Sequence, residues 1–243
     1  MFKKSLILSI LLILFSTNIG KAQAALLVLL LGDAVASENF YFSIKGGANY
    51  SDITGINDGS SKLGFNFGLA ANIKLSDKFF VVAEFTPLSN KGVKSVSPLI
   101  TGNLVIDSLL QNPSSASRNF NYIDIPVMLK YQVSKQFSIA AGPQISYLLS
   151  AVDYVEADIP GDDNLFYENN IKSQLNKFDY GLVVDLVYSL VEARGGKGIN
   201  IHARYGLGLG DILKDNSGDA LRNSVFQFAV SFPFILLEEE EEE

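Results

Sequence analysis

Residues 63–75 read LGFNFGLAANIKL and decide the fold, because an apolar side chain stands at every second position. Leu63, Phe65 and Phe67 begin one apolar face, whereas Asn66 and Lys74 belong to the opposite, polar face. Successive side chains of a β-strand point to opposite faces of the sheet, while a helix repeats every 3.6 residues. The stretch therefore predicts a strand with one apolar and one polar face.

The same alternation recurs in seven other segments, each on the order of ten residues long, as strands are. These segments are residues 39–51, 79–88, 121–132, 137–147, 178–189, 199–207 and 222–234. Together with residues 63–75 they make eight strands. An even number of amphipathic strands is typical of bacterial outer-membrane barrels.

The connections between these segments alternate in length. Short connections are predicted at residues 76–78, 134–136 and 195–197, and longer ones at residues 52–62, 89–119, 151–176 and 211–220. Short turns at one rim and long loops at the other are typical of outer-membrane barrels, whose turns face the periplasm. We therefore predict an all-β fold, an eight-stranded antiparallel up-and-down transmembrane β-barrel over residues 39–234.

Alternation alone does not say which face points inward. A soluble, lipocalin-like barrel would bury the apolar face and leave Lys45, Lys74 and Glu84 outside. A membrane barrel reverses the faces, and its aromatic residues gather near the two ends of the lipid-facing wall. Aromatic residues near strand ends, such as Tyr50, Phe79 and Tyr188, together with the loop asymmetry, favour the membrane barrel.

The N-terminus predicts export. Residues 1–4 are cationic, residues 6–15 are apolar, and Ala22-Gln23-Ala24 fits a signal-peptidase site. We expect a signal peptide at residues 1–24, an apolar extension at residues 25–38 and an acidic tail at residues 235–243. A single membrane anchor through both apolar runs is the alternative, but it would bury Lys21 at a cost of about 2.5 to 3.5 kcal/mol.

Composition excludes several classes of protein. The sequence holds no cysteine, so neither a disulfide framework nor a thiolate metal site exists. Six of the negative charges behind the net charge of −7 come from residues 238–243. No basic patch points to nucleic acid.

The polar faces of the predicted strands carry charges of both signs. In a narrow barrel they would project into the lumen, where unpaired charges are costly. We therefore predict a structural polar network in the lumen. Its members are Lys45, Lys74, Glu84, Asp124, Lys130, Asp179, Asp185, His202 and Arg204. A small water path lined by some of these side chains is the alternative.

Catalytic, metal-binding and cofactor-binding residues are not identified. His202 is the single histidine, so a Ser-His-Asp triad or a histidine metal site would have to centre on it. We interpret it as a lumen side chain. Asp158, Asp162, Asp163 and Glu168 crowd one loop and could bind calcium, although a solvated acidic loop is the commoner arrangement.

Several stretches resemble the porin-like outer-membrane β-barrel domain family common in Bacteroidetes. They are residues 42–50 (FSIKGGANY), 121–130 (NYIDIPVMLK), 142–147 (GPQISY), 178–181 (FDYG) and 204–208 (RYGLG). The resemblance implies a monomeric eight-stranded barrel in the cell outer membrane, without established catalytic residues. Such chains usually end on the aromatic residue of the last strand, whereas here Phe234 precedes the acidic tail.

Three functional hypotheses follow. The leading one is a non-enzymatic structural or surface-binding protein whose long extracellular loops contact an external ligand or protein. The alternatives are a small porin-like channel for ions or solutes and, ranked lower, a lipid-active barrel enzyme. The expected partners are outer-membrane lipid and the barrel assembly machinery, with no nucleic acid and no cofactor.

Overall fold

The computed structural model describes residues 39–56, 58–110, 113–158, 165–194, 197–215 and 218–234. The predicted signal peptide, the apolar extension and the acidic tail lie outside these residues. Among the described residues, no helix combines the length and the apolar character needed to span a bilayer.

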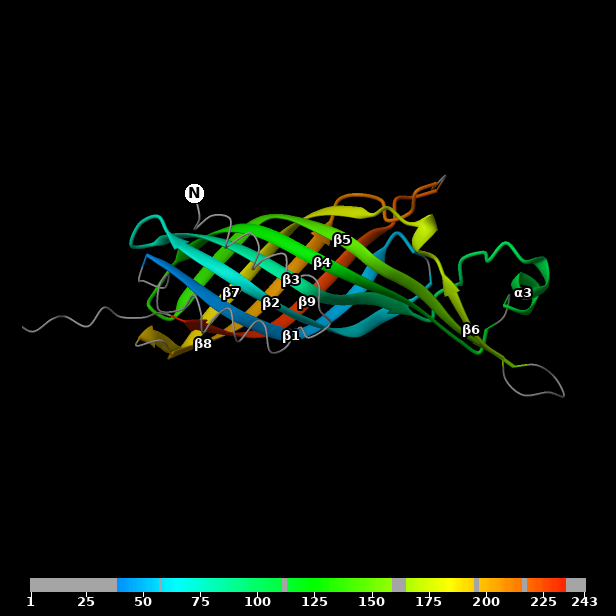
Figure 1. The fold of residues 1–243 in the computed structure, drawn as a ribbon, viewed down its shortest axis with the longest axis horizontal. Coiled ribbons are helices and arrows are strands. Elements are labelled where there is room, and N and C mark those ends of the chain that lie inside the picture. The colour runs from blue at the N-terminus through cyan, green and yellow to red at the C-terminus, as the bar shows by residue number, and fades with distance from the viewer. Residues whose placement is uncertain are drawn as a thin grey trace, which may run out of the picture.

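Strands make up most of the described chain (Figure 1). They are β1 (Phe40–Thr54), β2 (Ser60–Lys74), β3 (Phe79–Lys94), β4 (Ser115–Gln132), β5 (Phe137–Ala157), β6 (Leu165–Asn170), β7 (Phe178–Arg194), β8 (Lys197–Gly208) and β9 (Arg222–Phe234). A short helix, α3 (Leu104–Leu109), and a 3₁₀ turn (Lys172–Gln174) lie in the connections.

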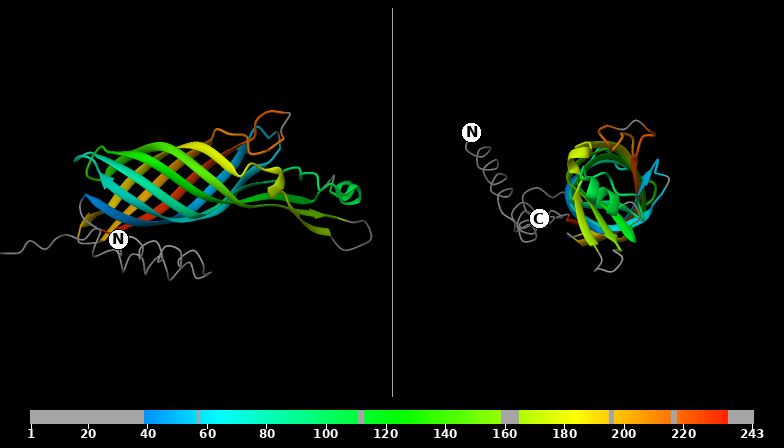
Figure 2. Two further views of the ribbon diagram at one scale, coloured as in Figure 1. Left: turned by 45° about the horizontal axis from the view of Figure 1, so that its top comes forward. Right: turned by 90° about the vertical axis from the view of Figure 1, so that its right-hand side faces the viewer.

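Eight of these strands close into a barrel. Their order around the ring is β4-β3-β2-β1-β9-β8-β7-β5, and β5 pairs with β4 to complete it. All of these pairings are antiparallel. Seen from the loop end, the strands form a closed ring (right-hand view of Figure 2). The predicted fold class, a closed antiparallel eight-stranded β-barrel, is confirmed.

The apolar faces of the strands point outward. Phe65, Leu182 and Phe228 each expose more than half of their surface, whereas Lys45 and Arg204 are 3% exposed inside the ring. A water-soluble barrel would require the opposite arrangement, because it gains stability by burying apolar surface. The wall is instead suited to hydrocarbon, in which a closed sheet leaves no backbone edge without a partner. The lipocalin-like alternative is therefore excluded.

The strands on the loop side are longer than predicted. β3 continues to Lys94 and β4 begins at Ser115, so the predicted loop at residues 89–119 shrinks to residues 95–114. The predicted loop at residues 52–62 likewise shrinks to residues 55–59. The alternation of apolar residues arises from contact of one face with lipid. It weakens where the barrel extends beyond the bilayer, although the hydrogen-bonded strands continue there.

Two irregularities reverse which residues face inward. In β3 the pairing with β4 shifts between Thr86 and Ser89, and the intervening Pro87 and Leu88 both point outward. In β5 the pairing with β4 skips Leu149. A bulge inserts one residue into a strand and so exchanges its two faces beyond that point. Proline fits such a site because it cannot donate to a ladder.

An arm projects beyond the barrel at the loop end (Figures 1 and 2). The loop-side half of β5 pairs with β6, which is not a wall strand, and α3 lies beside this hairpin. A small apolar core joins them, in which Ile106 from α3 and Leu165 and Tyr167 from β6 pack against Val155 of β5. The predicted loop at residues 151–176 is therefore largely ordered structure.

Candidate functional site: the lumen and its polar network

The centre of the lumen holds a buried ionic cluster. The Arg204 guanidinium donates to both carboxylate oxygens of Glu84, each at 2.7 Å. It also donates to Asp185 Oδ2 at 2.6 Å. Lys45 Nζ lies 2.5 Å from Glu84 Oε2. All four side chains are no more than 4% exposed. Two cations and two anions thus balance one another, as buried charges require.

This cluster crosses the barrel. Glu84 belongs to β3 and Arg204 to β8, which stand on opposite sides of the ring. Their bidentate pair therefore ties two facing walls together through the middle of the lumen. Closer to the loops, Asn223 of β9 donates to Tyr122 Oη on the facing strand β4 at 3.4 Å. A barrel of eight strands leaves an interior that side chains can fill, and here they do.

His202 extends the cluster toward the turn side. Its Nδ1 lies 3.0 Å from Asp185 Oδ2 and its Nε2 lies 2.8 Å from Ser231 Oγ. A neutral ring that donates from Nδ1 and accepts at Nε2 satisfies both contacts. Asn200 and Ser189 continue the chain of hydrogen bonds at 3.4 and 2.8 Å.

The order Asp185, His202, Ser231 has the connectivity of a catalytic triad. Two features separate it from a working one. The adjoining cavity measures about 30 Å³, which is room for water and not for an acyl substrate. Asp185 Oδ2, which orients the imidazole, is also bound by Arg204. The geometry is that of a chain of hydrogen bonds between buried side chains.

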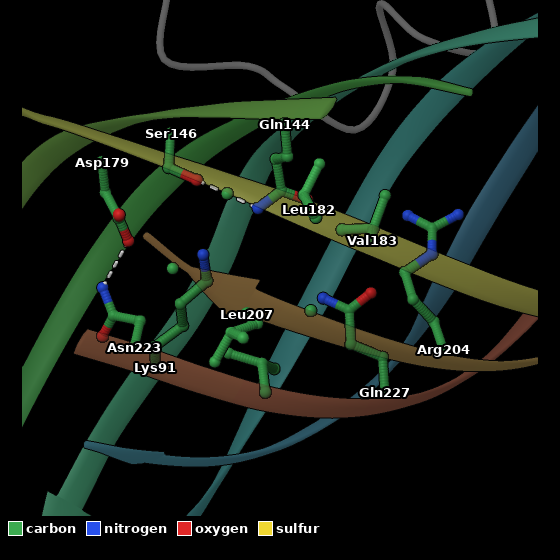
Figure 3. A pocket seen from close by; sticks show the side chains of 14 residues that line it. Lys91, Gln144, Ser146, Asp179, Leu182, Val183, Arg204, Leu207, Asn223 and Gln227 are labelled. Carbon is green, nitrogen blue, oxygen red and sulfur yellow. Dashed lines mark hydrogen bonds between the residues drawn. The ribbon is translucent and has the colours of Figure 1, made fainter. Parts of the chain in front are cut away.

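A second polar layer lies nearer the loops (Figure 3). Lys91 Nζ pairs with Asp124 Oδ1 at 2.8 Å and sits 4.7 Å from the centre of the Tyr122 ring. Asn223 donates to Asp179 Oδ2 at 2.8 Å. The cavity between these groups measures about 20 Å³, enough for one ordered water.

Another ion pair, separate from both polar layers, fixes the long connection between β3 and β4. Arg118 donates to both carboxylate oxygens of Asp153, at 2.7 and 2.8 Å. The same two side chains bind this connection, since Asp153 accepts from Leu99 N at 2.9 Å and Arg118 donates to Ser97 O at 3.2 Å. The pair therefore holds a loop down over the barrel mouth.

An apolar cluster covers the polar layers at the loop end. It combines inward-facing wall residues with residues of the loops that fold over the mouth. Its buried members are Ile53, Val93, Val96, Phe120, Tyr122, Leu148, Ala151, Ile171, Leu175 and Ile212. These side chains form an apolar cap, packed as in the cores of soluble proteins.

At the rim, Asp58 is held by Ser97 of the neighbouring loop. The Ser97 hydroxyl and backbone amide donate to Asp58 Oδ2 at 2.5 and 2.9 Å. Hydrogen bonds to the ionised carboxylate favour the charged form, so the Ser97 hydroxyl holds the pKa of Asp58 below its usual value. The contact is solvent-exposed and ties two loops together.

The structure places eight of the nine predicted network residues in three groups. Lys45, Glu84, Asp185, His202 and Arg204 form the central cluster, and Asp124 and Asp179 stand in the second layer. Lys130 lies toward the turns, where its ammonium donates to Tyr41 Oη and Asn72 Oδ1 at 3.2 and 3.1 Å. Lys74 is not brought to the network. It is the last residue of β2 and pairs with Asp77 in the adjacent turn.

Sequence reasoning missed Lys91, Arg118 and Asp153. Lys91 and Asp153 follow the bulges in β3 and β5, so extrapolated alternation would assign them to the wrong face. Arg118 falls in a segment predicted to be loop, although it keeps the inward phase of Asp124, six residues later. Pro87 and the unmatched charges of Asp124 and Lys91 were the available signals.

Among the described residues, no cluster of His, Asp or Glu is arranged to hold a metal ion. Asp162 and Asp163 of the proposed calcium loop lie outside the described residues, so that alternative stays a prediction.

The comparisons with known proteins agree with this geometry. The model of the outer membrane protein beta-barrel domain family matches residues 33–214. The chain belongs to this family. Membership in it assigns the barrel to the outer membrane and its apolar wall to the lipid of that membrane. No curated protein matches the chain.

Solved structures of other small barrels are similar to this family member at low identity. Neisserial surface protein A is 12% identical with a TM-score of 0.39, covering 80% of this chain and 97% of that one. OprG from Pseudomonas aeruginosa is 13% identical with a TM-score of 0.39, covering 82% and 98%. Ail of Yersinia pestis, solved with a heparin analogue, is 10% identical with a TM-score of 0.39, covering 81% and 99%.

Proposed function

We propose that this outer-membrane barrel is a non-enzymatic surface-binding protein, in which the wall is a scaffold and the loop-end arm contacts an external ligand or protein. The observation that carries the proposal is the filling of the lumen by side chains. The Glu84–Arg204 pair crosses the interior, and the apolar cap lies above it. A pore would have to break both barriers.

The arm supports the binding role. Ile100, Leu104 and Phe166 expose 75%, 87% and 74% of their surface. Leu104 begins α3, Ile100 lies in the connection that leads to it, and Phe166 belongs to β6. Both α3 and β6 project beyond the barrel (Figure 1). Large apolar side chains in water are unfavourable unless a partner covers them, so exposed ones mark candidate interaction sites. The small apolar core beneath them keeps the arm folded and therefore pre-organised.

Single-channel recording in planar bilayers tests the filled lumen. We expect no steady conductance from the purified protein, and none from a Glu84→Gln variant unless the barrel itself is damaged. Steady wild-type conductance that lumen substitutions abolish would establish the porin-like alternative instead.

Adhesion measurements test the arm. Proteoliposomes carrying the protein are applied to surfaces coated with purified extracellular proteins or polysaccharides. We expect retention on at least one coating and its loss in a Leu104→Ser/Phe166→Ser double variant. A Phe67→Ser variant, altered on the lipid-facing wall, is the control. Retention that is equal in all three proteins would remove the arm from the proposal.

A further inference from the structure

The wall of the barrel is irregular between β2 and β3 near the loop end. The pairing runs from Ser61 with Val93 to Asn66 with Ser89, so that four residues of β2 face three of β3. Side chains of β1 replace part of the ladder, because Asn49 donates to Asn90 O at 2.9 Å and the Ser51 hydroxyl donates to Gly92 O at 3.0 Å.

Two glycines permit this geometry. A Cβ at Gly64 would lie 2.3 Å from Asn90 O, and a Cβ at Gly92 would lie 2.1 Å from Arg118 O. Gly92 also has a φ of +156°. Any other residue at either position would force the strands apart, so the sequence specifies the close approach of β2, β3 and β4 at this level.

A groove of about 350 Å³ lies on the barrel wall at the irregularity. Its floor contains a row of polar side chains on adjacent strands: Asn90 donates to Asn121 Oδ1, and Asn121 donates to Ser150 Oγ at 2.8 Å. Leu63 and Phe65 of β2 border this row and are 58% and 63% exposed. The groove therefore joins a polar floor to an apolar rim.

A lysine spans the groove. Lys62 Nζ donates to Ser117 Oγ at 3.3 Å and to Asn119 Oδ1, both on β4, and so crosses β3 where Gly92 carries no side chain. Its ammonium has three donors, which leaves one for a ligand. Lys94 pairs with Ser117 across β3 and β4, so a second lysine lies beside the groove, although it is not among the residues that line it. No Asp or Glu is among the described residues that line the groove.

We propose that this groove binds the phosphate-bearing headgroup of an anionic lipid from the outer leaflet. Lys62 contacts the phosphate, the amide side chains of the floor bind the remaining polar atoms of the headgroup, and the acyl chains lie along Leu63 and Phe65.

The position of the groove at the edge of the apolar wall favours a lipid over a soluble ligand. On β4 the outward residues Ile125 and Val127 are apolar and exposed, whereas Asn121 and Asn119, further toward the loops, are polar. Phe65, Asn90 and Asn121 are neighbours across β2, β3 and β4, as the register of these strands shows. A headgroup at this position has its acyl chains beside the hydrocarbon-facing wall.

Native mass spectrometry of the detergent-solubilised protein tests the site. The probes are dioleoyl phosphatidic acid, which is anionic, and dioleoyl phosphatidylcholine, which has the same chains and no net charge. We expect one phosphatidic acid to be retained in preference to phosphatidylcholine. Lys62→Ala should weaken retention roughly tenfold, since hydrogen bonds to charged groups are among the strong ones. Lys135→Ala, at an exposed turn position on the opposite rim, should leave it unchanged.

A second variant protects the test against a folding defect. Asn121→Leu removes a floor amide but keeps a side chain that the edge of the bilayer tolerates, and it should also weaken retention. Equal retention of the two lipids, or equal retention by the variants and the Lys135→Ala control, would overturn the proposal. Displacement of the lipid by millimolar inorganic phosphate would overturn it as well, because the site would then recognise free phosphate.

Discussion

At the scale of single residues, Arg204 is the side chain whose removal would leave the most buried charge without a partner. It neutralises Glu84 and Asp185 together, and burial leaves water unable to replace it. Glu84 would keep Lys45 as its one remaining cationic contact among the described pairs, and Asp185 would keep the hydrogen bond with His202. The residue is therefore more a structural requirement of the barrel than a candidate ligand group.

Arg204→Met should lower the free energy of unfolding by about 3–5 kcal/mol, the usual cost of breaking a buried pair from one side. Urea unfolding in phospholipid vesicles measures this loss. The folded fraction is read on a detergent gel from unheated samples, in which the folded barrel migrates faster than the unfolded chain. Lys135→Met, at an exposed turn position, should change stability by less than about 0.5 kcal/mol. A loss below about 1 kcal/mol for Arg204→Met would contradict the central role assigned to this cluster.

Ser231 should not react as a nucleophile. Its hydroxyl is hydrogen-bonded to His202, but the residue is 3% exposed and its cavity admits water alone. A fluorophosphonate probe that labels activated serines should leave the folded protein unmodified. Labelling that disappears in both Ser231→Ala and His202→Ala would show a working triad and revive the enzyme hypothesis.

At the scale of elements, the bulge in β3 determines which charges enter the lumen. Before it, Glu84 and Thr86 face inward, and after it Ser89 and Lys91 do. If the same residues ran on with regular alternation after Thr86, Asn90 would face inward in place of Lys91, and Asp124 would lose its partner. The bulge thus supplies the cation for the second polar layer.

Inserting an alanine between Ser89 and Asn90 should therefore destabilise the barrel by about 3–5 kcal/mol, because it turns Lys91 outward and leaves the buried Asp124 carboxylate unpaired. The fraction of the fast-migrating band over a urea series reports the change. Deleting Pro87 is the control, because it removes the extra residue of the bulge and keeps Ser89 and Lys91 inward, so it should cost clearly less than the insertion. An insertion variant as stable as the deletion variant would show that the inward position of Lys91 is not what stabilises this layer.

At the scale of the whole molecule, the barrel reverses the arrangement of a soluble protein, since its apolar side chains lie outside and its charged side chains lie inside. Contact with lipid removes the apolar surface of the wall from water, as burial does for the core of a soluble protein. The centre of the barrel is filled by side chains whose charges balance. The apolar cap at the mouth is the exception, since it buries an apolar core above the bilayer, where water is the solvent. The molecule therefore combines a membrane scaffold with a soluble-type plug and arm.

Labelling of the protein in vesicles by a membrane-partitioned carbene reagent tests this arrangement with no substitution at all. Val184 is 48% exposed on the wall and Val183 is 2% exposed in the lumen, although they are neighbours of the same residue type in β7. Val184 should be labelled and Val183 spared, as resolved by tandem mass spectrometry. Labelling of Val183 in place of Val184 would invert the assigned faces.

Alternation in the sequence by itself determined the fold class, the strand count of the barrel and the composition of its two faces. Residues 63–75 illustrate why. The side of the sheet to which a side chain points is a local property of an extended chain, and it repeats every second residue. The same property placed Lys45, Glu84, Asp185 and Arg204 on one face. The alternation of apolar and polar side chains ends where the wall leaves the lipid. For this reason the loop-side parts of β3, β4 and β5 were predicted as loops.

Only the tertiary structure decided which charges meet. Glu84 and Arg204 are 120 residues apart, and closure of the ring is what sets them on facing walls. Three other features depend in the same way on the register and on the two bulges. They are the pair of Arg118 with Asp153, the apolar cap and the groove around Lys62. A bulge changes facing by one residue at a place that the pattern of side chains marks only faintly, so these contacts are properties of the closed sheet and not of any one strand.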